Sequence, residues 1–105
     1  MAQFTVCRNK NPQTSAVVPF LLDIQNDLLS DLETRVVVPL CPFSSMKGKT
    51  VRTLMPVLDI EGERFVMLTP QMAGIPKREV GAPVLQLDQY RSEIIAAVDF
   101  LLTGI

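Results

Sequence analysis

The chain has 105 residues, the usual size of one domain, and its 48% hydrophobic and 20% charged residues argue against disorder. Its net charge of −1 argues against direct nucleic-acid binding, which depends on a basic surface. Histidine is absent, so the commonest general acid–base residue and zinc ligand is missing. We expect one domain over residues 1–105, without a cofactor or a metal.

The cysteines and the apolar segments predict a cytoplasmic protein. Cys7 and Cys41 lie far apart in apolar, strand-like segments, so we interpret them as buried thiols rather than a disulfide. The apolar run at residues 16–22 is interrupted by Pro19 and closed by Asp23, which is not typical of a signal peptide. No other stretch approaches the roughly 20 apolar residues that span a bilayer. We therefore expect no interaction with a membrane.

The first half of the chain predicts three short strands. Residues 3–8 alternate between apolar and polar side chains, as a half-buried strand does. Residues 17–24 form a second apolar segment, and the turn formers at 9–15 predict a hairpin loop between the two. Residues 34–40 are rich in valine and predict the third strand, which Pro39 either ends or places at a sheet edge.

Two loops in the first half of the chain contain candidate contact residues. The polar connection at residues 23–30 contains Leu28 and Leu29, which cannot both face inward on a strand. At least one leucine should be exposed or cover a neighbouring surface, and a short helical turn that caps the barrel is an equal alternative. The loop at residues 41–50 contributes to a small basic patch of Lys47, Lys49 and Arg52. A solvated loop explains this patch better than an anion site.

The second half predicts a hairpin, one more strand and a C-terminal helix. Residues 51–60 and 64–69 flank Gly62, which supplies the positive φ of a tight turn. Residues 77–80 predict a short strand, and the helix is expected at about residues 87–103. Five or six strands and one helix predict a mainly β protein: a partly open antiparallel barrel, about residues 1–84, with the helix packed on it.

The helix is apolar on more than one face. Asp88 is expected to cap its start, and only Asp99 is polar between Ile94 and Leu102, although a surface helix needs an apolar stripe only roughly 100° wide. The expected barrel face is Tyr90, Ile94, Val98 or Ala97, Leu101 and Ile105; the polar stripe is Ser92, Ala96, Asp99 and Thr103; and Ile95, Phe100 and Leu102 lie on the flanks. The flanks are too apolar to leave in water, which predicts a symmetric homodimer with this helix near the two-fold axis.

No motif points to catalysis: the chain has no phosphate loop, nucleophile elbow or metal-type cluster. A nuclease built from Arg, Asp and Glu alone stays open, but the lack of His, the acidic pI and the shortage of stacking aromatics argue against it. The chain ends in Leu102-Thr103-Gly104-Ile105, and an apolar residue after a glycine at a terminus suggests an end that is tucked in or presented to a partner.

Several segments together resemble the CcdB family of bacterial toxin–antitoxin proteins, the poisons of DNA gyrase. They are Gln3-Phe4, Asp23-Ile-Gln-Asn-Asp27, Arg35-Val-Val-Val-Pro-Leu40, residues 56–60, Met67-Leu-Thr69 with Met72, Ile75-Pro76 and residues 91–105. They cover essentially the whole chain in the order and spacing of the family. The resemblance implies a homodimer of SH3-like barrels that performs no covalent chemistry, and therefore a protein that is not an enzyme.

The resemblance also implies the target and the partners. Such a toxin binds the DNA gyrase A subunit and traps the gyrase–cleaved DNA complex, which blocks replication and transcription. A cognate CcdA-like antitoxin neutralises it by folding a disordered C-terminal segment onto the toxin. The two together repress their shared promoter, so operator DNA is bound only by the toxin–antitoxin complex, and such pairs are associated with plasmid maintenance.

Site residues follow from the resemblance position by position. The gyrase-facing residues are Leu28, Leu29, Asp99, Leu102, Thr103, Gly104 and Ile105. Plasmid-type members have Trp, placed to stack on an arginine of gyrase, where this chain has Thr103, and an amide side chain where it has Asp99. Lys47, Lys49 and Arg52 are candidates for contact with an acidic antitoxin segment, and Ile95, Phe100, Leu102 and Thr103 are candidates for the dimer interface.

Two alternatives to gyrase poisoning stay open. One is a weakly toxic or non-toxic homologue that acts mainly in antitoxin binding and autoregulation, which the threonine at position 103 favours. The other is an mRNA-cleaving toxin, because ribonuclease toxins share a related barrel.

Overall fold

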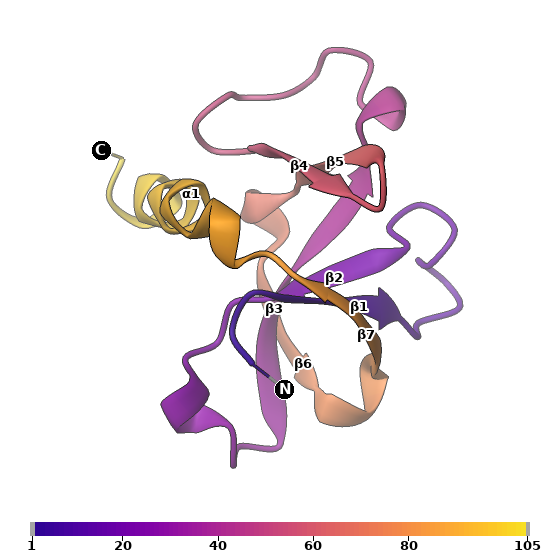
Figure 1. Ribbon diagram of the computed structural model, residues 1–105, viewed down its shortest axis with the longest axis vertical. Coiled ribbons are helices and arrows are strands. Elements are labelled where there is room, and N and C mark those ends of the chain that lie inside the picture. Colours follow the sequence, from indigo (N-terminus) through magenta and orange to yellow (C-terminus); the bar gives the residue numbers. More distant parts are fainter. Residues whose placement is uncertain (1, 105) are drawn as a thin grey trace.

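Seven antiparallel strands form one curled sheet, and an α-helix follows them near the C-terminus (Figure 1). This computed structural model describes residues 2–104. The elements are β1 (Thr5–Asn9), β2 (Phe20–Asp23), β3 (Thr34–Pro42), β4 (Val57–Ile60), β5 (Glu63–Met67), β6 (Ala73–Pro76), β7 (Val80–Gln86) and α1 (Arg91–Thr103). The prediction of a mainly β, partly open barrel with one C-terminal helix is confirmed, with seven strands rather than five or six.

The long strand β3 is the centre of the sheet. The strand order is β4-β5-β3-β2-β1-β7, and β6 also pairs with β3. On one edge of β3, β2 pairs with residues 37–40. On the other edge, β6 pairs with residues 34–37 and β5 with residues 40–42. One strand therefore has three neighbours and joins the two parts of the sheet.

Pro39 lies within β3 and does not end it, which corrects that part of the prediction. Its carbonyl oxygen accepts a hydrogen bond from the Leu68 N–H at 3.0 Å. The N–H and C=O of one strand residue point to the same side. The position of the missing Pro39 amide hydrogen therefore faces the junction between β5 and β6, where the ladder needs no donor from β3. The strand can then continue to Pro42.

The strand predicted at residues 77–80 is wrong. Lys77–Glu79 form a 3-10 turn, and β7 begins only at Val80. Gly81 lies in this strand, where an added Cβ would be 2.7 Å from the carbonyl oxygen of Arg8. This close approach of β7 to β1 requires glycine, so a residue that looks like a loop signal in the sequence serves strand pairing here.

The start of the helix also differs from the prediction. A 3-10 turn, Asp88–Tyr90, precedes α1, and Tyr90 occupies the N-cap position without a side-chain cap bond. Asp88 is therefore not the N-cap. The Tyr90 hydroxyl accepts the Asp59 N–H at 3.2 Å and donates to the Asp59 carboxylate at 3.4 Å. These bonds connect the first turn of the helix with β4.

The core lies between the curled sheet and α1. Its buried residues include Phe4, Val6, Leu22, Val38, Leu40, Leu58, Ile60, Phe65, Met67, Ile94 and Ala97. Within it the rings of Phe20 and Phe65 meet edge to face at 5.1 Å. The predicted helix faces are largely confirmed: Ile94 and Ala97 are buried, whereas the stripe of Ser92, Ala96, Asp99 and Thr103 is exposed. Leu101, predicted on the barrel face, is 36% exposed, because α1 covers the core with a narrower stripe than expected.

Cys7 and Cys41 are buried and are not joined in a disulfide, as predicted. Burial, together with the nearby Asp23 carboxylate, raises the pKa of Cys7 to about 11, and burial raises the pKa of Cys41. Both thiols therefore stay protonated at mildly alkaline pH, whereas the thiolate is the reactive form. We expect iodoacetamide to label neither cysteine in the native protein and both in concentrated urea, as measured by mass spectrometry.

The raised pKa of Cys7 also makes the stability of the protein depend on pH. The pKa of folded Cys7 lies above the ordinary value of 9.0. The stability that the protonated thiol contributes is therefore fully present below pH 9.0 and is lost as the pH rises toward 11. Rapid labelling of Cys7 in the native protein would contradict this account.

Candidate functional site

Leu28 and Leu29 lie on an exposed 3-10 turn between β2 and β3. The turn, which we call the leucine turn, spans Asp27–Leu29, and Leu28 is 90% exposed while Leu29 is 49% exposed. Asn26 begins it, because its side-chain oxygen accepts the Leu28 N–H at 2.8 Å. The interpretation that at least one leucine is exposed is confirmed. The alternative is right in that the segment forms a short helical turn, but the turn does not cap the barrel, because its leucines face solvent. Exposed leucines of this kind are typical of a protein contact.

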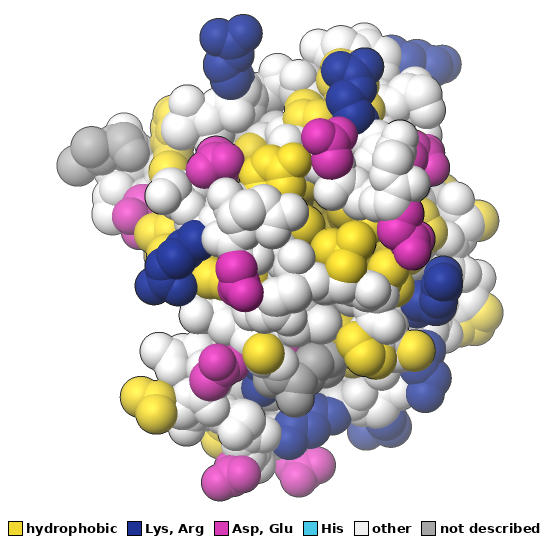
Figure 2. Space-filling view, viewed as in Figure 1, with side chains coloured by type: hydrophobic (Ala, Val, Ile, Leu, Met, Phe, Trp, Pro, Cys, Tyr) yellow, Lys and Arg dark blue, Asp and Glu magenta, His cyan; other side chains and the backbone are white. Residues whose placement is uncertain are grey.

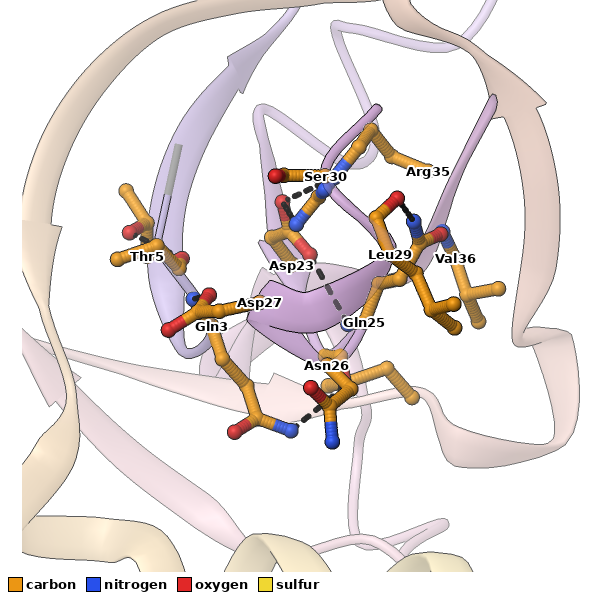
Figure 3. A network of polar contacts seen from close by, with 12 residues as sticks. Gln3, Thr5, Asp23, Gln25, Asn26, Asp27, Leu29, Ser30, Arg35 and Val36 are labelled. Atoms are coloured by element: carbon orange, nitrogen blue, oxygen red, sulfur yellow. Dashed lines mark hydrogen bonds and ion pairs between the residues drawn. The ribbon is translucent and has the colours of Figure 1, made fainter. Parts of the chain in front are cut away.

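Polar side chains connect the leucine turn with β2 and β3 (Figure 3). Gln25 Nε2 donates to the Leu29 carbonyl oxygen at 2.8 Å, and Gln25 Oε1 accepts the Val36 N–H at 2.9 Å. The backbone N–H of Gln25 donates to Asp23 Oδ1 at 3.0 Å. The other oxygen, Asp23 Oδ2, accepts a bond from Arg35 Nε at 2.8 Å. A continuous chain of bonds therefore runs from β3 to the turn.

The ion pair of Asp23 and Arg35 at the base of this network is almost wholly buried, with side-chain exposures of 0% and 2%. Arg35 Nη2 lies 2.7 Å from Asp23 Oδ2 but makes no hydrogen bond of good geometry within residues 2–104. Burial raises the pKa of Asp23, while the Gln25 amide and the Arg35 guanidinium oppose the shift because they favour the carboxylate. Each charge depends on the other, since an isolated buried charge is costly.

The end of α1 presents the second group of predicted gyrase-facing residues. Asp99, Leu102, Thr103 and Gly104 are exposed, and Leu102 is 68% exposed. The Thr103 hydroxyl donates to the Asp99 carbonyl oxygen at 2.7 Å, so this polar group already bonds within the helix. Gly104 follows the helix with a φ of 75°, a left-handed conformation that glycine favours. Ile105 lies outside the described residues.

A small groove lies between the helix and the segment that leads into the leucine turn. Its volume is about 170 Å³, and it is lined by Gln3, Phe4, Ile24, Ile94, Ile95, Val98 and Asp99. Ile24 lies at the start of the connection that carries the leucines, whereas Asp99 belongs to the last turns of α1. Figure 1 shows the leucine turn and the end of α1 on the same side of the molecule. Of the predicted gyrase-facing residues in the described chain, Asp99 is the one that lines this groove.

Of the three residues of the predicted basic patch, one lines a groove and the other two do not. Lys47, Lys49 and Arg52 are all exposed, and only Lys47 lines the groove of about 520 Å³ beside this loop. Arg64 lines the same groove, and its guanidinium carbon lies 4.4 Å from the centroid of the Phe43 ring. Sequence reasoning missed Arg64, because nothing in the sequence places the β4–β5 turn beside this loop. Figure 2 shows acidic and basic side chains interspersed on the viewed face.

The predicted dimer-interface residues lie on the outer side of α1. Ile95 is 37% exposed, Phe100 is half-buried, and Leu102 and Thr103 are exposed. Leu101 adds to this outer surface, which is therefore partly apolar. The homodimer itself stays a prediction.

Sequence reasoning also missed the network beneath the leucine turn. In the sequence Asp23 only closes an apolar run, and nothing beside it indicates a bond to Arg35 or Gln25. The available signal was an arginine in an otherwise apolar strand, because a charge in such a position is rarely buried without a partner. Identifying the partner requires the β2–β3 pairing, which places Asp23 opposite Val37.

The structure and the surface together define a class of protein. Within residues 2–104, no group of three or more His, Cys, Asp or Glu side chains could hold a metal ion. The described part of the chain also has no helix that is long and apolar enough to cross a membrane. The described part of the chain is a small, mainly β domain with exposed leucines. Such leucines are typical of a protein that acts by binding another protein.

The comparison with protein families makes the identification specific. The family model described as "CcdB protein" matches residues 3–104. The chain therefore belongs to the CcdB family, whose members are toxins of toxin–antitoxin systems that poison DNA gyrase and are not catalytic enzymes.

Proposed function

We propose that this protein binds the DNA gyrase A subunit and traps the gyrase–cleaved DNA complex, thereby blocking replication and transcription. Its family supports this mode of action. The observation that carries the proposal for this chain is the side chain of Leu28, 90% exposed on a turn that the side chains of Gln25 and Asn26 hold in place. Full burial of a leucine contributes about 1.5–3 kcal/mol, which the isolated chain leaves unused. A protein that covers the turn gains this energy.

The proposed gyrase-binding surface combines the leucine turn with the end of α1. It consists of Leu28, Leu29, Asp99, Leu102, Thr103, Gly104 and Ile105. The exposed leucines supply apolar area, and the carboxylate of Asp99 supplies a charge at the rim. A contact with an apolar centre and a polar rim is the usual anatomy of a protein interface.

We also propose a homodimer that uses the outer side of α1, with Ile95, Phe100, Leu102 and Thr103 at the interface. The support is the partly apolar outer surface of the helix. Leu102 and Thr103 are assigned to both the dimer and gyrase, which is consistent if the helix ends of two protomers meet near the two-fold axis and present one joint surface.

The proposed antitoxin is CcdA-like, and its disordered acidic segment meets Lys47, Lys49 and Arg52. Lys47 is the best supported of the three, because it shares a groove with Arg64 and Phe43. Opposite charges there would speed encounter with an acidic segment. Operator DNA is proposed to bind only to the toxin–antitoxin complex, and the protein acts in the cytoplasm.

One observation keeps a second candidate function open, that of a weakly toxic homologue acting in antitoxin binding and autoregulation. Thr103 lacks an aromatic ring, and its hydroxyl already bonds to the Asp99 carbonyl. It cannot supply the cation–π interaction that a tryptophan would supply to an arginine of gyrase. This candidate differs from the first only in how strongly gyrase is bound.

The decisive experiment incubates the purified protein with gyrase, supercoiled DNA and ATP, and separately with RNA. The expected result is accumulation of cleaved DNA and intact RNA. Cleaved RNA without trapped DNA breaks would instead support an mRNA-cleaving toxin. Neither product, together with tight antitoxin binding, would support the weakly toxic homologue.

A single substitution tests the surface. Leu28→Asp places a charge where the proposed interface buries a leucine, so we expect at least about tenfold weaker binding to the gyrase A subunit, measured by calorimetry. Val17→Asp is the matched control, because Val17 is also exposed, at 68%, but lies on the β1–β2 loop. Equal losses for the two variants would refute the assignment of the leucine turn.

A further inference from the structure

Four side-chain hydrogen bonds lie in and beside the leucine turn, and two of them reach its backbone, at Leu28 and Leu29. The bonds from side chains are Asn26 Oδ1 with Leu28 N at 2.8 Å, Gln25 Nε2 with Leu29 O at 2.8 Å, Asp27 Oδ1 with Gln3 N at 2.7 Å and Lys77 Nζ with Ser30 O at 2.6 Å. They come from both sides of the turn and from distant parts of the chain. The turn therefore has a defined shape before any partner arrives.

Gln25 is the buried member of this set. It is 5% exposed, and both ends of its side-chain amide are used, one by the Leu29 carbonyl and the other by the Val36 N–H. Its backbone N–H is held in turn by Asp23, which is paired with Arg35. Figure 3 shows Gln25 between the strand and the turn. Asp23 therefore fixes the position of Gln25, and Gln25 in turn fixes the leucine turn at Leu29.

The core does not need the turn in this shape. Neither Leu28 nor Leu29 belongs to the core or packs against it. A flexible segment loses conformational entropy when it binds a partner, and this loss lowers the affinity. A segment already ordered by bonds to the fold avoids this cost. The bonds beneath the leucine turn are therefore better explained by the contact that it makes than by the stability of the barrel.

We infer that Gln25 is a positioning residue for partner binding: it holds the leucine turn in the shape that docks on gyrase without touching gyrase itself. The inference rests on the proposed function, which supplies the partner. Gln25 then determines how much of the leucine contact is realised. Its effect on affinity must pass through Leu28 and Leu29.

The test uses Gln25→Glu, which keeps an oxygen for the Val36 N–H but loses the donor to the Leu29 carbonyl. We expect about tenfold weaker binding to the purified gyrase A subunit. Gln13→Glu, which makes the same charge change on an exposed loop, is the control and should bind within about twofold of the wild type. Amide hydrogen exchange should become faster at residues 28–32 and stay unchanged in β3 and β5.

A combined variant separates positioning from general destabilisation. If Gln25 acts through the leucines, adding Gln25→Glu to a background with both Leu28→Ala and Leu29→Ala should weaken binding by less than about twofold beyond that background alone. A full additional loss in the combined variant, or faster exchange throughout the sheet, would overturn the inference in favour of a structural role.

The remaining outcomes distinguish the two proposals. If the wild type binds gyrase and Gln25→Glu binds as well as Gln13→Glu does, the inference fails and the proposed function stands. If the wild type does not bind the gyrase A subunit, the proposed function fails, and the docking role of Gln25 fails with it.

Discussion

Deletion of residues 103–105 is expected to abolish trapping of cleaved DNA by gyrase while leaving the protein folded. The described part of this segment, Thr103 and Gly104, is exposed and outside the core. Deletion shortens α1 by one residue and removes two bonds, from the Thr103 hydroxyl to the Asp99 carbonyl and from the Gly104 N–H to the Phe100 carbonyl, a loss on the order of 1–2 kcal/mol. The proposed contact, in contrast, loses three of its seven residues.

The cleavage assay and thermal unfolding measure the two effects separately. Thr103→Val is the matched control, since it removes the hydroxyl bond but keeps the chain length and the shape of the side chain. This variant should trap cleaved DNA nearly as well as the wild type. A truncated protein that still traps DNA at the wild-type level would show that the assignment of the helix end to gyrase is wrong.

Arg35→Met is expected to destabilise the protein by about 3–5 kcal/mol, the largest loss predicted for a single substitution here. It leaves the carboxylate of Asp23, which is 0% exposed, without its counter-charge. Since total stability is typically about 5–15 kcal/mol, much of the protein could unfold at physiological temperature. Urea unfolding at one fixed protein concentration measures the loss, and Arg78→Met, at an exposed arginine, is the control.

The cause of this loss can be tested by charge and by pH. Asp23→Asn in the Arg35→Met background keeps an acceptor for the Gln25 N–H and removes the charge, so it should restore part of the stability. Without Arg35, the pKa of Asp23 rises further above its ordinary 3.8. The penalty is therefore full above this raised pKa and shrinks, relative to the wild type, as the pH falls toward 3.8. A loss that is independent of pH would point to packing instead.

Arg35→Met and Gln25→Glu affect different properties of the region around the leucine turn. Arg35 and Asp23 hold the connection between β2 and β3, and the leucine turn sits on that connection. Loss of the ion pair acts on the whole fold, whereas loss of the single bond from Gln25 acts on the turn. A buried ion pair can in this way support a contact surface at some distance from it, even where its net contribution to stability is small compared with the cost of removing one partner.

Secondary structure was predictable where the pattern is local. The valine-rich run became β3, and Gly62 lies in a two-residue hairpin turn in which Glu61 also has a positive φ, 53° against 84°. Predictions failed where pairing decided the outcome. Pro39 is accommodated because its missing amide faces a junction between two strands, and the strand predicted at residues 77–80 begins only at Val80, where β7 pairs with β1.

The family, the mainly β class, the C-terminal helix and the unusual pair of leucines were all evident from composition, periodicity and residue order, which are local properties of the chain. Three features required the folded structure: the leucines face solvent, Gln25 holds their turn, and Asp23 is paired with Arg35. Burial and pairing depend on which strands become neighbours. Strand register brings together side chains whose relation the sequence does not contain.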